Sequence, residues 1–145
     1  MSILTTANPR PDLNSQVGLD KFPHETRYAL QAAQDKQALN ITLLDLNEMG
    51  AFADCFLLCS AASAPQMEAI ADEVERQLAS HHRRVLHREG RPGSEWLLLD
   101  FGGLVVHIFT EHARLFYDLE RLWRDARRLD VREPAPPFTA REGGG

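Results

Sequence analysis

The sequence predicts a small single-domain α/β protein. Its 145 residues fall within the size of one domain, and 43% hydrophobic residues are enough to build a core on both faces of a small sheet. Short apolar runs alternate with longer segments of helical period. No run approaches the roughly 20 apolar residues that span a bilayer, and the first residues lack the features of a secretory signal or transit peptide. We therefore expect a cytoplasmic protein without a membrane anchor.

Composition changes at both ends of the chain. The first residues include Pro9 and Pro11 among polar neighbours without a sustained period, and the chain ends in the Pro/Gly-rich sequence EPAPPFTAREGGG. Such segments bury too little apolar surface to offset the entropy of ordering. We expect a flexible N-terminal arm over residues 1–22, a folded domain over 23–130 and a flexible C-terminal tail over 131–145.

The first half of the domain predicts helices and interior strands. Residues 24–36 are rich in Ala and Gln without a breaker, which favours a helix. The apolar runs ITLLDL (41–46) and CFLLCS (55–60) are bounded by turn signals, as in interior strands, although runs this short leave a helix possible. Ser63 and Gln66 then form the capping-box pattern of a helix that continues at apolar period to about His81.

The second half predicts a β-hairpin. A third strand could form over 83–89, and residues 96–101 and 104–109 flank Gly102-Gly103, a dipeptide suited to a type I′ turn in which both central residues have positive φ. Pairing across this turn collects only apolar side chains on one face, which we expect to be core. These are Leu97, Leu99, Phe101, Leu104, Val106 and Ile108.

The other face of the hairpin carries mixed chemistry. Trp96 lies opposite Phe109, while Asp100 and His107 are diagonal neighbours with backbones roughly 7–8 Å apart. Two interpretations remain open and equally weighted. His107 can be a half-buried histidine steadied by Asp100, or the pair can be a polar hot spot beside an aromatic anchor.

A closing helix is expected from Glu111 to about Leu129. Its apolar residues fall within an arc of roughly 120° and predict a core stripe: Leu115, Phe116, Leu119, Leu122, Trp123 and Ala126. Tyr117 lies outside this arc, among arginines. It is either a solvated side chain making cation–π contacts or part of a contact surface.

Signals of catalysis are missing. The chain has neither the glycine-rich dinucleotide loop nor the P-loop pattern. Cys55 and Cys59 lie four apart in an apolar run, which indicates buried thiols, and His81, His82 and His87 do not have the spacing of a metal site. We expect no enzymatic activity, no cofactor and no metal.

Charge points to the class of partner. The net charge of −5 and pI near 5.6 make general nucleic-acid binding a poor expectation. An acidic protein is better suited to a basic protein partner, with little direct nucleic-acid contact.

Several motifs taken together resemble a known family. They are FAD (52–54), WLLLD (96–100), VVHIF (105–109) and RLFYDLERLW (114–123). In this order they are similar to the Iojap-related ribosomal silencing factors, RsfS in bacteria, over about residues 25–126. Departures are modest: Cys55 replaces a common tyrosine, and Ala61-Ala62 stands where a glycine often precedes the helix cap.

The resemblance implies a mixed β-sheet of about five strands flanked by helices, a nucleotidyltransferase-like fold without the catalytic signature. It also implies binding to the large ribosomal subunit through ribosomal protein L-fourteen. Such binding blocks association with the small subunit and represses translation under nutrient limitation. Family members are often dimeric, so a homodimer is possible.

Candidate contact residues combine this resemblance with the hairpin and helix analysis: Trp96, Asp100, His107, Tyr117 and Trp123, with Arg114 and Asp118 as flanking polar groups. The helical stripe alone also accounts for Trp123. The alternative function is a nucleotidyltransferase-like, nucleotide-binding enzyme using Asp45 or Asp100 for metal.

Overall fold

The computed structural model describes residues 18–132 and shows a mixed α/β fold. Its elements, in chain order, are α2 (Thr26–Asp35), β1 (Leu39–Asp45), β2 (Cys55–Ala61), α3 (Ala64–Ser80), β3 (His87–Glu89), β4 (Trp96–Asp100), β5 (Leu104–Thr110), α4 (Glu111–Tyr117), α5 (Leu119–Leu122) and β6 (Arg127–Asp130).

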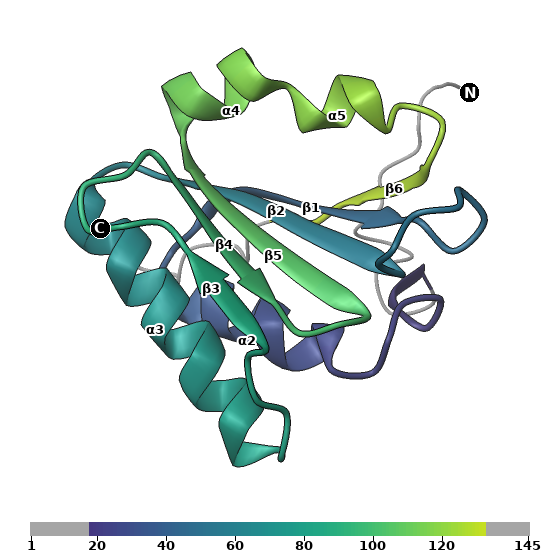
Figure 1. Ribbon diagram of the computed structural model, residues 1–145, viewed down its shortest axis with the longest axis horizontal. Helices are drawn as coiled ribbons and strands as arrows, with labels where there is room; N and C mark the ends of the chain where they lie inside the picture. Colours follow the sequence, from purple (N-terminus) through teal and green to yellow (C-terminus); the bar gives the residue numbers. More distant parts are fainter. Residues whose placement is uncertain (1–17, 133–145) are drawn as a thin grey trace, which may run out of the picture.

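One six-stranded sheet organises these elements, in the order β3-β4-β5-β2-β1-β6. The central pair, β2 and β5, is parallel, and the other neighbouring strands are antiparallel. Helices α2 and α3 cover one face of the sheet, and α4 with α5 lies over the other (Figure 1). The expected mixed sheet flanked by helices is confirmed, with six strands where about five were expected.

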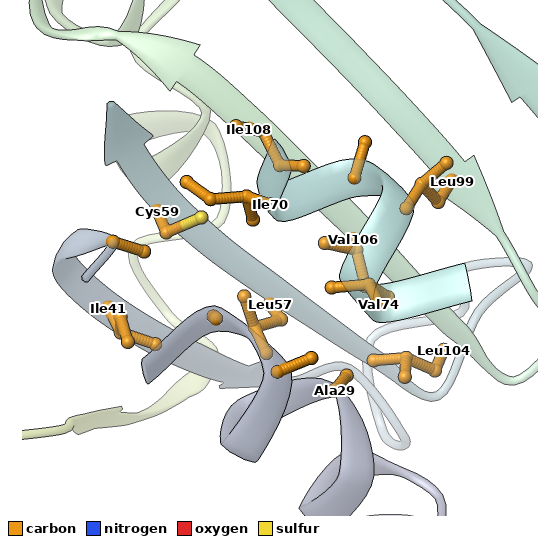
Figure 2. Close-up of a cluster of buried hydrophobic side chains, with 14 of the residues drawn as sticks. Ala29, Ile41, Leu57, Cys59, Ile70, Val74, Leu99, Leu104, Val106 and Ile108 are labelled. Atoms are coloured by element: carbon orange, nitrogen blue, oxygen red, sulfur yellow. The ribbon is translucent and has the colours of Figure 1, made fainter. Parts of the chain in front are cut away.

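The main core lies between the sheet and helices α2 and α3. Figure 2 shows Leu57 and Val106 from the parallel strand pair meeting Val74 of α3, with Ala29 of α2 close by. These side chains are fully buried. A smaller cluster on the opposite face contains Leu44, Leu46, Leu58, Phe109, Ala113 and Ala126.

Helix α3 begins at the predicted cap. Ser63 Oγ accepts a hydrogen bond from the Gln66 backbone N–H at 3.2 Å. The Gln66 side chain departs from a capping box, because its Oε1 accepts from the Ala62 N–H rather than from Ser63. Its Nε2 donates to the carbonyls of Lys36 and Gln37, which ties the start of α3 to the end of α2.

The hairpin has the predicted register, with Trp96 opposite Phe109 and Leu98 opposite His107. The predicted turn type is wrong. Gly102 has φ +95°, but Gly103 lies outside the left-handed region. A glycine with positive φ at the first central position alone is typical of a type II′ turn, which matches the right-handed twist of the strands equally well.

The predicted closing helix is wrong beyond Tyr117. Asp118 adopts a left-handed conformation (φ 50°, ψ 51°), α5 forms a single turn, and the chain then becomes β6. Strand β6 pairs with β1, where Leu129 lies opposite Leu43 and is 7% exposed. Pairing with an open sheet edge satisfies backbone groups that periodicity along the chain cannot take into account.

The folded unit extends slightly before residue 23. Phe22 is buried in the main core and Leu19 packs against it. The rest of the expected arm (1–17) and most of the expected tail (133–145) lie outside the described residues, so the division into arm, domain and tail remains a prediction. Within residues 18–132, no helix is long and apolar enough to cross a membrane.

Candidate partner-binding surface

Four aromatic rings gather where α4 ends above β4 and β5. Trp96 is at the centre: its ring centroid lies 4.7 Å from that of Tyr117, 5.1 Å from Phe109 and 5.8 Å from His107. We call Trp96, His107, Phe109 and Tyr117 the aromatic cluster. Cross-strand pairing places Trp96 beside Phe109, and the short helix α4 brings Tyr117 down onto them.

His107 supports the cluster from within the fold. It is 3% exposed, and its Nδ1 accepts a hydrogen bond from Trp96 Nε1 at 3.1 Å. Burial lowers the pKa of His107 to about 3, so the ring is neutral. The Nε2 atom therefore carries the proton, and it has no hydrogen-bond partner among the described residues.

Asp100 does not steady His107. Its Oδ1 accepts from the Gly102 backbone N–H at 2.8 Å and closes the hairpin turn. The interpretation of a half-buried histidine held by Asp100 is therefore wrong, because Trp96 supplies the hydrogen bond and His107 is fully buried. Sequence register identified the correct strand pair, but it cannot show which polar partner a side chain chooses.

A groove of about 610 Å³ lies beside the aromatic cluster. It runs between the loop before β4 and the exposed side of Trp96 and Tyr117. Its lining residues are Glu89, Gly90, Gly93, Ser94, Glu95, Trp96, Leu98 and Tyr117. Lys, Arg and His are absent from this lining, so the groove combines aromatic rings with negative charge.

Three of the residues expected in the core stripe are exposed instead. Leu115, Phe116 and Leu122 are 75%, 72% and 70% exposed, and we call them the exposed apolar residues. The other members of the stripe, Leu119, Trp123 and Ala126, do pack on the sheet. Periodicity missed the exposed residues as contact candidates because it assumed an unbroken helix, and the break at Asp118 changes the direction of the chain.

Arg114, expected as a flanking polar group, is buried and joins several elements through its hydrogen bonds. It is 8% exposed, and its guanidinium donates to the Asn40 carbonyl, the hydroxyls of Ser60 and Thr42, and both oxygens of Glu120. These bonds use all of its donors. Burial raises the pKa of Glu120, but the bonds and charges of Arg114 and Arg128 prevail and lower it overall.

The remaining candidate contact residues either hold the fold together or are accessible to a partner. Asp118 provides the left-handed residue between α4 and α5, a conformation in which Asp is enriched. Trp123 is partly buried and packs edge-on against Phe56, with centroids 6.0 Å apart. Tyr117 is 50% exposed, and Trp96 lines the groove. Of the predicted contacts, the last two are the ones that a partner can reach as aromatic anchors.

The carboxylates that a nucleotidyltransferase-like enzyme would need for metal lie apart in the sheet. Asp45 and Asp100 are on β1 and β4, separated in the sheet by β2 and β5, and each accepts a backbone N–H of a turn. Burial raises the pKa of Cys59 to about 12 and that of Cys55 further, so both thiols are protonated. Within residues 18–132, no group of three His, Cys, Asp or Glu residues could hold a metal ion.

Comparison with known proteins now adds the family. The model of the family described as "Ribosomal silencing factor during starvation" (RsfS) matches residues 20–143. The chain belongs to the RsfS family. An RsfS protein of Bacillus subtilis is 38% identical over 105 residues, which cover 72% of this chain and 89% of that protein. The chloroplastic protein Iojap of Arabidopsis thaliana is 30% identical over 101 residues, covering 70% of this chain and 42% of the longer plant protein.

Solved structures share the RsfS fold seen here. A crystal structure from Chromobacterium violaceum has a TM-score of 0.67 at 26% identity and covers 79% of this chain and 96% of its own. A second, from Bacillus halodurans, has a TM-score of 0.64 at 30% identity and covers 73% and 96%. The resemblance predicted from the motifs is therefore confirmed at the level of family and fold.

Proposed function

We propose that this RsfS-family protein binds the large ribosomal subunit through ribosomal protein L-fourteen and sterically blocks association with the small subunit. It would act in the cytoplasm, without enzymatic activity, and repress translation when nutrients are limited. The family match supports a silencing role, since its relatives are named ribosomal silencing factors.

The observation that carries the proposal is the chemistry of the α4–α5 layer. Tyr117 and the exposed apolar residues display large side chains to solvent, and Tyr117 lies next to Trp96 in the groove. Aromatic anchors are enriched in protein interfaces, and charged residues are depleted at their centres. An exposed face of this kind on an acidic chain suits a basic protein partner.

The test uses purified protein and isolated ribosomal subunits. We expect the protein to co-sediment with large subunits and to reduce their pairing with small subunits. Tyr117→Ala and Phe116→Ala should each weaken large-subunit binding about tenfold or more, in the range of an interface anchor. Leu86→Ala is the matched control, because Leu86 is 71% exposed but belongs to the opposite side of the sheet, near α3.

Two outcomes would contradict the proposal: a folded protein that does not bind large subunits, or one that binds them and leaves subunit joining unchanged. Light scattering tests a further possibility, that the same face forms a homodimer. If Tyr117→Ala abolished dimerisation and left large-subunit binding intact, the face would be a self-interface and a different surface would contact the ribosome.

A further inference from the structure

We propose that His107 is a positioning residue for partner binding, which holds the indole of Trp96 in one orientation on the α4–α5 side of the sheet. The inference rests on the proposed function and deepens it, because it gives a role in recognition to a side chain that no partner can touch. His107 is 3% exposed, whereas Trp96 lines the groove together with Tyr117. His107 would therefore act through Trp96 and not by contact with the partner.

Trp96 depends on side-chain contacts for its orientation. It is the first residue of β4, and β3 pairs with this strand only from Leu98 onward, so a strand neighbour lies on one side of Trp96 alone within residues 18–132. Its ring contacts Phe109 and Tyr117 at centroid distances of 5.1 and 4.7 Å. Ring contacts tolerate a range of angles, whereas a hydrogen bond weakens steeply as it bends. The 3.1 Å bond from Trp96 Nε1 to His107 Nδ1 therefore fixes the angle of the indole.

The acceptor of this bond is itself held by the fold. His107 lies in the middle of β5, opposite Leu58 of β2 and Leu98 of β4. Its ring centroid is 4.5 Å from that of Phe56 and 6.1 Å from that of Phe109. Burial lowers the pKa of His107 and keeps the ring neutral, and because an indole N–H can only donate, Nδ1 is the unprotonated nitrogen. The acceptor atom therefore has one position and one protonation state.

The presence of histidine at this buried position needs a reason beyond packing. The other residues of β5 before Thr110 are aliphatic or aromatic, and an aliphatic side chain could be buried there without a polar atom. His107 Nε2 is buried without a hydrogen-bond partner among residues 18–132, which costs free energy. The bond to Trp96 is the side-chain hydrogen bond that His107 makes within these residues, and a leucine could not make it.

This hydrogen bond decides what Trp96 can offer a partner. The indole N–H is the only polar group of the side chain, and it is already used, so a partner meets the surface of the ring and not a donor. A ring that is held at a fixed angle before contact loses little rotational freedom on binding, whereas ordering a free side chain of this size weakens binding about two- to tenfold. His107 should contribute an effect of this size to the affinity.

The experiment compares two substitutions of the same shape. Asparagine places its Oδ1 as many bonds from the backbone as His107 Nδ1, and leucine has a methyl carbon there instead. We expect His107→Leu to weaken binding to isolated large subunits about two- to tenfold, and His107→Asn to bind more tightly than His107→Leu. Co-sedimentation measures the affinities at a temperature where thermal unfolding shows each variant to be folded. Equal affinities of the two variants would overturn the inference.

A double-mutant cycle separates positioning from a general effect on the fold. Trp96→Phe keeps an aromatic ring but removes the indole N–H. If His107 acts through Trp96, His107→Leu should not weaken large-subunit binding further in the Trp96→Phe background. A merely structural role predicts the same loss of affinity in both backgrounds, and that result would overturn the inference.

The two tryptophan indole N–H signals report the hydrogen bond itself by NMR. The Trp96 signal, assigned by its loss in Trp96→Phe, should exchange with solvent faster in His107→Leu than in the unaltered protein. His107→Asn should slow this exchange again, and the Trp123 signal should keep its rate in all three proteins. Unchanged exchange of the Trp96 signal in His107→Leu would show that His107 does not hold the indole.

The inference and the proposed function can fail separately. If the unaltered protein binds large subunits and His107→Leu binds them equally well, the positioning role fails and the proposed function stands. If the folded, unaltered protein does not bind large subunits, the proposed function fails, and the positioning role fails with it because Trp96 then has no such partner.

Discussion

Arg114 donates two hydrogen bonds to the carboxylate of Glu120, one from Nε and one from Nη2, each 3.1 Å long. The two residues lie on either side of Asp118, the left-handed residue at which the helix breaks. The same guanidinium reaches β1 and β2 through Thr42 and Ser60. This clamp joins α4 and α5 to the sheet and sets the direction of the layer that carries Tyr117 and the exposed apolar residues.

Removal of the clamp should destabilise the fold. Arg114→Ala leaves buried hydroxyls and a carboxylate without their donor, and we expect a loss of roughly 2–4 kcal/mol in the free energy of unfolding. Arg114→Lys keeps the charge but loses the planar set of guanidinium donors. Its free energy of unfolding should therefore lie between those of Arg114→Ala and the unaltered protein. Urea denaturation measures both. Arg124→Ala, at an exposed position, should stay within about 0.5 kcal/mol; an equal effect at both arginines would contradict the clamp.

Stability should fall in mild acid because of His107. The pKa of this side chain is about 3 in the folded protein, against 6.5 for an unperturbed histidine, so the unfolded chain binds the proton more tightly. The stabilisation that neutral His107 gives the folded protein is fully present above about pH 6.5 and is lost as the pH falls toward 3. At pH 5 it should be lower by about 2 kcal/mol than at pH 8.

The control for this pH effect is His107→Asn, which offers Trp96 an oxygen acceptor but does not titrate. Denaturation at pH 5 and pH 8 should show a smaller difference for this variant than for the unaltered protein. The lowered pKa of Glu120 acts in the same direction but below its ordinary value of 4.5, so it adds little in this window. Equal pH dependence of the two proteins would show that His107 is not the cause.

Two phenylalanines on the same side of the sheet should behave in opposite ways. Phe109 is 1% exposed, and Phe109→Ala should cost about 3–5 kcal/mol through lost burial and a cavity. Phe116 is 72% exposed, and Phe116→Ala should change stability by less than about 0.5 kcal/mol. Thermal unfolding compares them directly. A large loss at Phe116 would mean that it packs in the core, as the helical pattern had predicted.

Replacement of Gly90, which lines the groove, should destabilise the fold. Gly90→Ala must accommodate both a positive φ and a Cβ 2.4 Å from Leu97 Cδ2, so we expect a loss of about 2–4 kcal/mol. Gly93 also has positive φ (+88°), but a Cβ there meets nothing within 4 Å. Gly93→Ala should therefore cost only about 1 kcal/mol. Similar losses at both glycines would show that backbone conformation alone, and not close packing, determines the effect.

Much of this protein follows from the sequence by itself. The N-cap at Ser63, the apolar runs of the two interior strands and the register of the hairpin can each be read from residues close together in the chain, and they were predicted correctly. The order of specific motifs identified the family. Local pattern suffices in these cases because caps, alternation and two-residue turns satisfy their hydrogen bonds within a few residues.

Tertiary structure alone decided what the chain does after Tyr117. Leu115, Phe116 and Leu122 have helical spacing with Leu119, and nothing nearby in the sequence signals that they face solvent. The helix breaks because Arg114 finds partners on β1 and β2, and because β6 finds an open edge beside β1. Such contacts join residues far apart in the chain, and their free energy exceeds the small preference of an isolated segment for helix.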